Sequence, residues 1–469
     1  MHEASEKRKA RWQLFLLVGT GVALAATLLA QRLLLNPMDF QEAGGLLSPE
    51  NLEWASYLAH FLFPSIFAAF LLWYGILLKR TGQISSRLFL KLVIAFFFVF
   101  AAIAIVTHPT KSQDIYWNML LAKGSVVHHL NPYLTTPDML RGDPWFAPYL
   151  TWTHLPMMYG PLWTYLITGA VYVGQSLAAS VLLVKLVALA SLLLSGYALW
   201  RIMALHRMTD GAKNTVMLLL AWNPAVLQLL LMDAHNDFLV VPSILLSYLF
   251  FKQEKYAASA LILLPGGFVK YVPFFLLPIP LFYLLFRNNM PWLKKCAQFG
   301  GVLLGAAGLA ALLYAPFGGI TASIAAAGDA ILPGTTDASL FPTMAITTTL
   351  GLELPAVRTM GLVIGIFVMV WFLFRSKPLL AYTFPLLAIL IFGTPWVLPW
   401  YFLWILPLLM LFLPSFAIIL LSVFLMVIPS PLSPLTASYL FASLYIGGRL
   451  LFPEQHLMNP ISKASSAST

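Results

Sequence analysis

The chain of 469 residues contains few charged residues and a single cysteine. Charged side chains make up 9% of the sequence, whereas about a quarter is usual in soluble globular domains. Because Cys296 is the only cysteine, no internal disulfide can form, and thiol redox chemistry and thiolate-bound metals are excluded. Hydrophobic residues instead reach 60%, and the mean hydropathy is +0.85. This composition predicts a polytopic membrane protein.

Apolar runs of nearly membrane-spanning length follow one another from Trp12 to Leu451. They leave no room for a separate soluble domain, so we expect one all-α transmembrane domain over residues 1–469. The first run follows a basic start, is long, and shows no small-residue cleavage site. We interpret it as an anchor and not as a cleaved signal peptide.

The distribution of charge predicts the orientation of the chain. Basic clusters separate the apolar runs, for example at 7–11, 79–91 and 201–213, and such clusters mark the cytoplasmic face. Most acidic residues fall in the opposite loops. We therefore expect both termini in the cytoplasm, and the net charge of +10 reflects topology rather than a nucleic-acid partner.

The spacing of apolar runs and basic clusters predicts about 12 to 14 transmembrane helices. The expected spans are 12–31, 55–78, 88–107, 180–204, 214–232, 237–251, 257–286 as two short helices turning near Lys270, 296–315, 358–375, 378–394, 400–429 as a hairpin, and 434–451. Residues 161–175 are interpreted as re-entrant or interfacial. If they crossed fully, Arg201, Arg207 and Lys213 would lie outside.

Two long outer loops are expected, at about 108–160 and 316–356, and loops of this length are often functional. In the first, the apolar positions after Asp114 favour an amphipathic, interfacial helix on the outer leaflet. Asp114 either caps this helix or acts as a general base at the membrane surface. Asn131-Pro132 is equally consistent with a simple turn.

A second polar group follows the kink at Trp222-Asn223-Pro224 and comprises Asp233, His235, Asn236 and Asp237. Asp233 and Asp237 are four residues apart, so on a helix they would share a face. Asn236 or Asp237 could instead cap the next span. A metal site of Asp233, His235 and Asp237 is a weaker alternative, because no supporting motif accompanies it.

Lys270 stands among apolar residues next to Gly266-Gly267, at the turn between two short helices. A lysine at the membrane centre costs about 2.5 kcal/mol or more, so it either snorkels to the surface or binds an anion such as phosphate. The aromatic stretch of Thr394-Pro395-Trp396 and Pro399-Trp400-Tyr401 is typical of an aromatic belt, and stacking on a sugar is the functional alternative.

These segments together carry a family resemblance. In order, they are Ser112-Gln113-Asp114-Ile115-Tyr116, Asn131-Pro132-Tyr133, Gly142-Asp143-Pro144-Trp145, Met158-Tyr159-Gly160-Pro161-Leu162-Trp163, Asn223-Pro224, His235-Asn236-Asp237, the Lys270 segment and Pro399-Trp400-Tyr401. Their order resembles that of the GT-C glycosyltransferases, and most of all the bacterial polyprenol-phosphomannose-dependent α-mannosyltransferases of the cell envelope. The resemblance covers roughly Lys111 to Tyr401.

The resemblance implies a GT-C-like helical bundle in a bacterial plasma membrane, with an active site on the extracytoplasmic face. It implies an inverting enzyme that moves a hexose, above all mannose, from a polyprenyl-phosphate-linked donor to a hydroxyl of a glycan or lipid acceptor. Asp114 would be the catalytic base, and Lys270 and His235 would bind the donor phosphate. Sugar or acceptor would contact Tyr116, Asn131, Tyr133, Asn236, Asp237, Trp400 and Tyr401. No cofactor is required, although a divalent metal is compatible with this chemistry.

Other functional classes predict other patterns. A secondary transporter should show an internal repeat and polar groups at the membrane midplane, and the sequence shows neither. A lipid-linked-sugar polymerase or ligase would share the lipid-phosphate site but should place more arginines in its outer loops. A member that binds the lipid without catalysis would not need Asp114.

Overall fold

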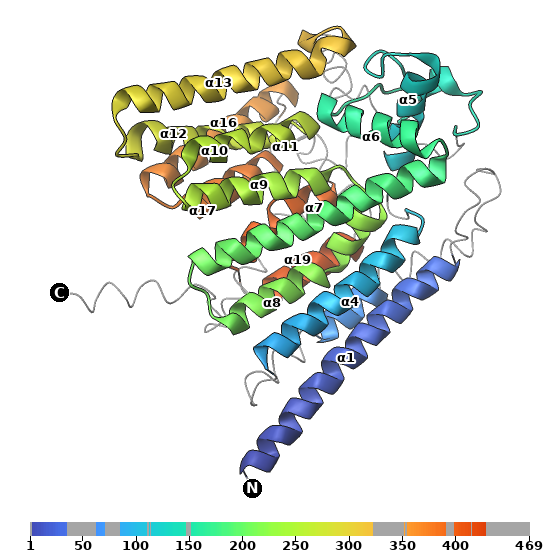
Figure 1. Ribbon diagram of the computed structural model, residues 1–469, viewed down its shortest axis with the longest axis vertical. Coiled ribbons are helices and arrows are strands. Elements are labelled where there is room, and N and C mark those ends of the chain that lie inside the picture. The colour runs from blue at the N-terminus through green and yellow to red at the C-terminus, as the bar shows by residue number, and fades with distance from the viewer. Residues whose placement is uncertain are drawn as a thin grey trace.

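The computed structural model of the protein describes residues 2–34, 62–70, 85–109, 112, 114–146, 152–321, 351, 354–390, 398–413 and 415–427. Every regular element in this part of the chain is helical, and none is a strand. Figure 1 shows the helices gathered into one bundle, with α1 and α13 along opposite edges. The predicted all-α class is therefore confirmed.

Long apolar helices confirm that the protein is a membrane protein. The candidate spans among the described residues are Ala10–Leu34 in α1 (His2–Leu34), α4 (Ser86–Val106), α7 (Leu177–Leu205) and Trp292–Phe317, which begins with α13 (Trp292–Tyr314). A bent pair at 53°, α8 (Asp210–Ala221) and η3 (Val226–Met232), can form one more. The total of 12 to 14 stays a prediction, since several expected spans, such as 434–451, lie outside the described residues.

The kink predicted at Trp222-Asn223-Pro224 separates α8 from η3. The Asn223 side-chain oxygen accepts hydrogen bonds from the backbone N–H groups of Ala225 (3.0 Å) and Val226 (3.4 Å). The Asn223 amide donates to the Ser422 hydroxyl (2.7 Å) in α19 (Ser415–Val427). These bonds replace helical hydrogen bonds that are lost at the kink. Backbone polar groups in an apolar environment need such partners.

The pair of short helices predicted on either side of Lys270 is also confirmed. The first arm contains α10 (Tyr256–Leu261) and α11 (Leu263–Val269), and the second contains η4 (Val272–Leu276), α12 (Pro278–Phe282) and η5 (Tyr283–Arg287). Prolines interrupt the second arm, because proline cannot donate a helical hydrogen bond. Lys270 lies at the break itself.

The first long outer segment forms α5 (Asp114–His128), η2 (Pro137–Leu140) and the start of α6 (Pro161–Gly174). Figure 1 places α5 and α6 together at one end of the bundle. Residues Ile115 to Ala122 of α5 are all buried, so this part of the helix has no solvent-facing side. The helix is confirmed, but its position at the membrane surface stays a prediction. The 14 residues of α6 span only about 21 Å, too short to cross a membrane alone.

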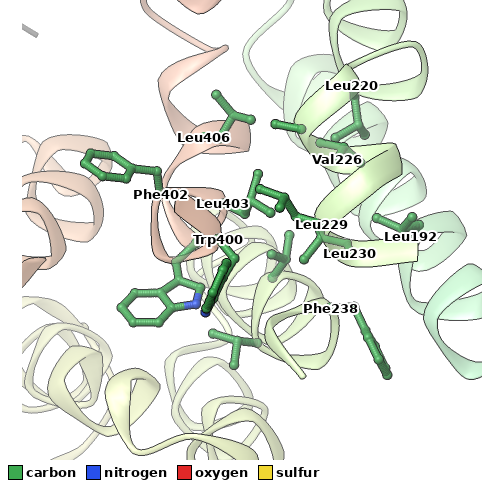
Figure 2. Packing of buried hydrophobic residues seen from close by; sticks show 14 of the residues in the cluster. Leu192, Leu220, Val226, Leu229, Leu230, Phe238, Trp400, Phe402, Leu403 and Leu406 are labelled. Carbon is green, nitrogen blue, oxygen red and sulfur yellow. The ribbon is translucent and has the colours of Figure 1, made fainter. Parts of the chain in front are cut away.

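The core brings the C-terminal helices against the middle of the chain. They are α16 (Leu354–Phe374), α17 (Pro378–Ala388), η9 (Pro399–Trp404), α18 (Leu406–Leu409) and α19. In Figure 2, Leu229 of η3 points toward Leu403 of η9. This packing holds η9 beside the start of α9 (Asp237–Lys252), where the polar residues gather. The second outer loop, 316–356, lies almost wholly outside the described residues.

The predicted orientation can be tested with two cysteines in a Cys296→Ser background. Met139 is 64% exposed on η2, in the first outer segment. Ser376 is exposed between Arg375 and Lys377, on the predicted cytoplasmic side. We expect an impermeant maleimide added to intact cells to label Met139→Cys. The control Ser376→Cys should be labelled only after the cells are opened. The reverse pattern would invert the topology.

Candidate active site

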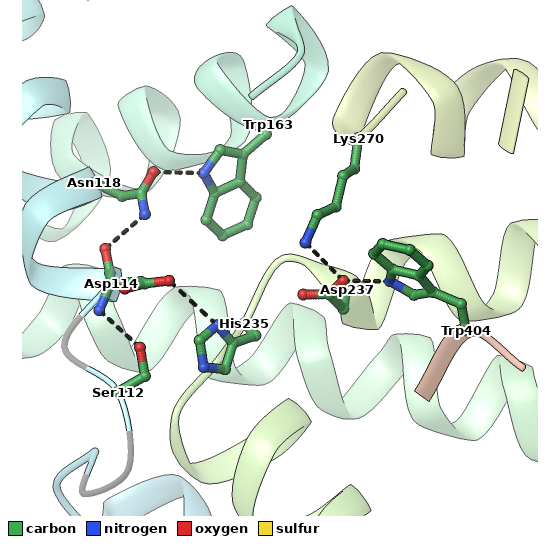
Figure 3. Close-up of polar contacts among 8 residues, drawn as sticks. All are labelled: Ser112, Asp114, Asn118, Trp163, His235, Asp237, Lys270 and Trp404. Atoms are coloured by element: carbon green, nitrogen blue, oxygen red, sulfur yellow. Dashed lines mark hydrogen bonds and ion pairs between the residues drawn. The ribbon is translucent and has the colours of Figure 1, made fainter. Parts of the chain in front are cut away.

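Asp114, His235, Asp237 and Lys270 lie together although they come from three distant segments of the chain. Figure 3 shows Asp114 facing His235, and Lys270 reaching toward Asp237. The Asp114 Oδ2 and His235 Nδ1 atoms are 3.7 Å apart, and the Lys270 ammonium donates to Asp237 Oδ1 at 2.8 Å. The structure therefore brings these four predicted site residues together, and their assigned roles stay predictions.

The backbone of Asp114 is fixed by neighbours in α5 and α6. The Ser112 hydroxyl accepts a hydrogen bond from the Asp114 N–H (3.2 Å), and the Asn118 amide donates to the Asp114 carbonyl (2.6 Å). Trp163 of α6 in turn donates to the Asn118 side-chain oxygen (2.9 Å). At the N-terminus of α5, the Ser112 side chain therefore accepts a backbone hydrogen bond, which is the role that Asp114 was alternatively predicted to have. The Asp114 carboxylate is left to face His235 (Figure 3).

The second polar group does not form one helical turn, so the predicted shared face of Asp233 and Asp237 is wrong. The helix η3 ends at Met232, and α9 begins only at Asp237. Between them Ala234 has φ = 53°, a left-handed conformation that redirects the backbone. The Asp233 Oδ1 atom accepts a hydrogen bond from Gln228 (3.1 Å) instead of pairing with Asp237.

The Asp237 carboxylate has its own hydrogen-bond partners. Asn236 makes no side-chain capping bond, and the Asp237 carboxylate accepts hydrogen bonds from Lys270 and from the Trp404 indole. The capping alternative for these residues is therefore wrong. The described residues contain no group of three His, Cys, Asp or Glu placed to hold a metal ion. The alternative metal site of Asp233, His235 and Asp237 is accordingly not formed.

Lys270 is enclosed by aromatic rings rather than extended toward a surface. Its ammonium lies 4.3 Å from the ring centre of Tyr401, 5.1 Å from that of Trp404 and 5.6 Å from that of Tyr159. These cation–π contacts and the ion pair with Asp237 hold the charge inside the protein. Snorkelling does not describe this lysine.

The segment that carries Lys270 rests directly on Gly160. The Gly160 N–H donates to the Val269 carbonyl (2.9 Å). A Cβ atom at position 160 would lie 2.1 Å from the Phe268 carbonyl oxygen, much closer than any real contact. Only glycine allows the two backbones to approach in this way. The Tyr159-Gly160-Pro161 motif is therefore the support on which the end of α11 lies.

The exposed fractions of the side chains divide the site into two layers. Asp114 is 17% exposed and Lys270 11%, whereas His235 is 2% exposed and Asp237 0%. We call Asp114 and Lys270 the front pair and His235 and Asp237 the back pair. The His235 ring is fixed by stacking on Trp400, with ring centres 3.8 Å apart and planes at 19°. Asp114 and Lys270 are therefore the more accessible members of the site.

Burial sets the protonation of the site. It raises the pKa of the Asp114 carboxyl to about 6; the Ser112 hydrogen bond and the Lys270 ammonium act in the opposite direction, and the Asp237 carboxylate adds to the increase. Burial also lowers the pKa of the His235 imidazole well below its ordinary value, and the Lys270 charge adds to this effect. At neutral pH, Asp114 is thus mostly ionised beside a neutral histidine.

Polar atoms of the back layer lack partners. The His235 Nε2, Asn236 Nδ2 and Asp237 Oδ2 atoms are buried and make no hydrogen bond with the described residues. Buried polar groups in native proteins are nearly always paired, so each such group calls for an explanation. Three successive residues with this property point to a place where a polar ligand completes the bonding.

Some of the predicted sugar or acceptor residues lie elsewhere. The Tyr116 hydroxyl is hydrogen-bonded to His108 Nε2 (3.0 Å), and the Tyr133 hydroxyl donates to the Tyr159 carbonyl (2.9 Å). The Asn131 amide donates to the Phe317 carbonyl (2.9 Å). The first two contacts lie within the first outer segment, the third joins it to Phe317 after α13, and none of the three is a contact with the front or back pair. Their predicted binding roles stay predictions.

Trp400 and Tyr401, by contrast, do lie at the site. Sequence reasoning missed two further residues there, Tyr159 and Trp404, which flank Lys270. Tyr159 could have been found, because it lies in the Tyr159-Gly160-Pro161 motif. Trp404 carried no signal beyond the general abundance of tryptophan near helix ends. Thr394-Pro395-Trp396 lies outside the described residues.

An all-helical membrane fold with ionisable side chains gathered at helix breaks is typical of proteins that act on substrates within or beside the membrane. Comparison with family models gives a narrower result. Residues 15–285 match the model described as alpha-(1->6)-mannopyranosyltransferase, N-terminal domain, which is more than half of the chain. The protein belongs to this mannosyltransferase family, as the order of motifs predicted. The matched range contains the front and back pairs but not Trp400, Tyr401 or Trp404. No curated protein matched the chain.

The close packing of Gly160 against the segment that carries Lys270 predicts that a side chain at position 160 lowers both stability and activity. Gly160→Ala should lower the free energy of unfolding by about 1–3 kcal/mol through overpacking, because the Phe268 carbonyl must move. It should also displace Lys270. The measurements are thermal unfolding of the purified protein in detergent and transfer of mannose. Gly169→Ala, in the adjoining helix α6 and with no neighbour within 4 Å of the added Cβ, is the matched control. Equal behaviour of the two variants would contradict the role of Gly160.

Proposed function

We propose that the protein is an inverting mannosyltransferase that uses a polyprenyl-phosphate-linked mannose as donor. The observation that carries this proposal is the front pair, a partly exposed carboxylate and a partly exposed ammonium, each next to a buried partner. Family membership supports the mannosyl group as the one transferred. The α-(1→6) linkage in the family's description is the linkage we propose for the product.

The front pair suits a single displacement at the anomeric carbon. Asp114 accepts the proton of the acceptor hydroxyl while that oxygen forms a bond to C1 of the mannose. The C1–oxygen bond to the lipid phosphate breaks, and its electron pair leaves with the phosphate. Because one displacement inverts C1, a β-linked donor gives an α-linked product. No covalent enzyme intermediate forms.

Lys270 is suited to hold the donor phosphate. An ammonium has three N–H donors, and Asp237 accepts from one of them. The others are available to phosphate oxygens, on which negative charge grows as the bond to C1 breaks. Asp237 keeps the ammonium protonated and in place. We therefore assign Asp237 to Lys270 rather than directly to the sugar.

The back layer suits the recognition of hydroxyl groups. The unpaired atoms of His235, Asn236 and Asp237 include a donor and an acceptor, and sugar hydroxyls can satisfy both. His235 lies behind Asp114 and is neutral, so we assign it to orienting that carboxylate more than to binding phosphate. Tyr401 offers an aromatic face beside Lys270 for stacking against the mannose ring.

The proposed setting is a bacterial plasma membrane with the site at its extracytoplasmic face and both termini inside. This side gives direct access to a lipid-linked donor in the outer leaflet, so no soluble nucleotide-binding domain is needed. The acceptor is a glycan or a lipid that carries a free hydroxyl. Lysine supplies the positive charge near the phosphate, and the proposed chemistry therefore needs neither a metal ion nor another cofactor.

Asp114→Asn should abolish transfer while leaving the affinity for polyprenyl phosphate nearly unchanged. The amide keeps the shape of the side chain but cannot accept the proton, and general-base catalysis contributes about 10²- to 10⁴-fold. The measurement is turnover of purified enzyme with polyprenyl-phosphate mannose and an alkyl mannoside acceptor. Asp138→Asn is the control, since Asp138 is an outer carboxylate paired with Arg141.

The pH profile of the wild-type enzyme gives a second check on Asp114. The active form is the carboxylate, whose pKa is raised to about 6. Turnover should therefore be nearly constant above pH 7 and should fall as the pH decreases through about 6, close to tenfold per unit below it. Full turnover of Asp114→Asn, or an unchanged rate at pH 5, would remove Asp114 as the base.

Lys270→Met should weaken binding of polyprenyl phosphate and also reduce turnover, because both depend on the ammonium. Lys270→Arg should retain part of each, since the charge remains although the donor geometry changes. Binding is measured by titration of the purified variants. Lys213→Met is the control, because Lys213 is also ion-paired, with Asp210 at 2.7 Å, but lies in α8. Wild-type affinity and turnover in Lys270→Met would leave the phosphate without its proposed partner.

A further inference from the structure

A second buried cation lies in the bundle outside the front and back pairs. Lys185 belongs to the candidate span α7, and its side chain is among the most deeply buried of the large residues, with 2% exposed. A charge buried within an apolar span is costly, and such residues are usually paired or functional. The proposed reaction makes no use of it, so its contacts require another explanation.

On one side, Lys185 binds the C-terminal end of α4. Its ammonium donates to the Thr107 carbonyl at 2.5 Å and to the Ala104 carbonyl at 3.4 Å. The last carbonyls of a helix have no partner within the helix and carry the negative end of its dipole. A lysine from a neighbouring helix thus fixes the point at which α4 ends.

The chain that leaves this point leads directly to Asp114. His108 follows Thr107, and its Nε2 atom is hydrogen-bonded to the Tyr116 hydroxyl in the first turn of α5 (3.0 Å). The His108 Nδ1 atom lies 2.7 Å from the Pro109 carbonyl. A side-chain hydrogen bond therefore links the residue after α4 to the first turn of α5, so that a shift at the end of α4 would reach the helix that begins at Asp114.

On its other side, Lys185 is attracted by the Asp233 carboxylate and repelled by the Arg32 guanidinium. Asp233 is fixed by Gln228 (3.1 Å), and Gln228 accepts a hydrogen bond from Gln31 of α1 (3.4 Å). Asp233 also begins the left-handed turn at Ala234 that presents His235. Lys185 consequently lies between the segments that deliver Asp114 and His235.

We propose that Lys185 is a positioning residue that sets the separation between the Asp114 carboxylate and the His235 imidazole. It does so by attracting the end of α4 and Asp233 toward one charge in the middle of the bundle. This inference rests on the proposed function of Asp114. A role in stability alone fits poorly, because an apolar residue of similar size would avoid the cost of burying a charge.

The test is Lys185→Met in the purified full-length enzyme, with Lys185→Arg and the control Ser195→Ala. Ser195 is buried in α7 and, among the described residues, donates to the Ser191 carbonyl of its own helix. A displacement of about 1 Å in a catalytic group can cost about 10²-fold in rate. We expect kcat for Lys185→Met to fall about 10- to 100-fold, with the KM for polyprenyl-phosphate mannose within about twofold of wild type. Lys185→Arg should recover part of kcat, and Ser195→Ala should leave it unchanged.

Titration with polyprenyl phosphate measures the amount of folded enzyme in each preparation. The kcat values are then expressed per folded molecule. If Lys185→Met does not fold, the charge-neutral variant Lys185→Met/Asp233→Asn replaces it and should show the same fall in kcat. Wild-type kcat per folded molecule in either variant would overturn the proposal. A lower activity caused by a higher KM for polyprenyl-phosphate mannose, with kcat unchanged, would also overturn it. Failure of the proposed function is distinguishable, since wild type would then transfer no mannose, or Asp114→Asn would retain transfer.

Discussion

The ion pair between Lys270 and Asp237 is the interaction around which the site is arranged. Both groups are almost completely enclosed, and a charge removed from water without a partner is costly. The pair therefore requires α11 and α9 to meet at one place, with the aromatic rings of Tyr401 and Trp404 beside the ammonium. Gly160 makes this meeting possible, because its missing side chain leaves room for the Phe268 carbonyl.

Helix breaks supply the backbone that places these groups. Asp114 begins α5, His235 lies in the turn between η3 and α9, and Lys270 lies between two short helical arms. An intact apolar helix would direct its side chains at lipid or at other helices. A broken one turns side chains and backbone groups into the interior, where neighbours such as Ser422 compensate for the lost hydrogen bonds.

Composition and apolar runs were enough to predict a membrane protein, and the order of motifs predicted the family. A common site for Asp114, His235, Asp237 and Lys270 was implied only by that resemblance. Spacing alone misled at Asp233 and Asp237, because a left-handed alanine leaves no trace in composition. The pairing of Lys270 with Asp237 was also missed, since both were judged by their local surroundings. Long-range contacts such as Trp404 with Asp237 depend on packing between distant segments, which periodicity does not report.

The proposed reaction moves negative charge across the front pair without changing its total. Before transfer, Asp114 and the phosphodiester each carry one negative charge; afterwards the carboxyl is neutral and the phosphate monoester carries both. Asp114 already feels the Lys270 ammonium, which opposes the rise of its pKa. As the proton arrives at Asp114, that attraction is released and the ammonium acts on the phosphate instead. An interaction that strengthens only as charge develops lowers the barrier without tightening the ground state. The fixed position of Lys270 between Asp237, Gly160 and the aromatic rings is what this exchange requires.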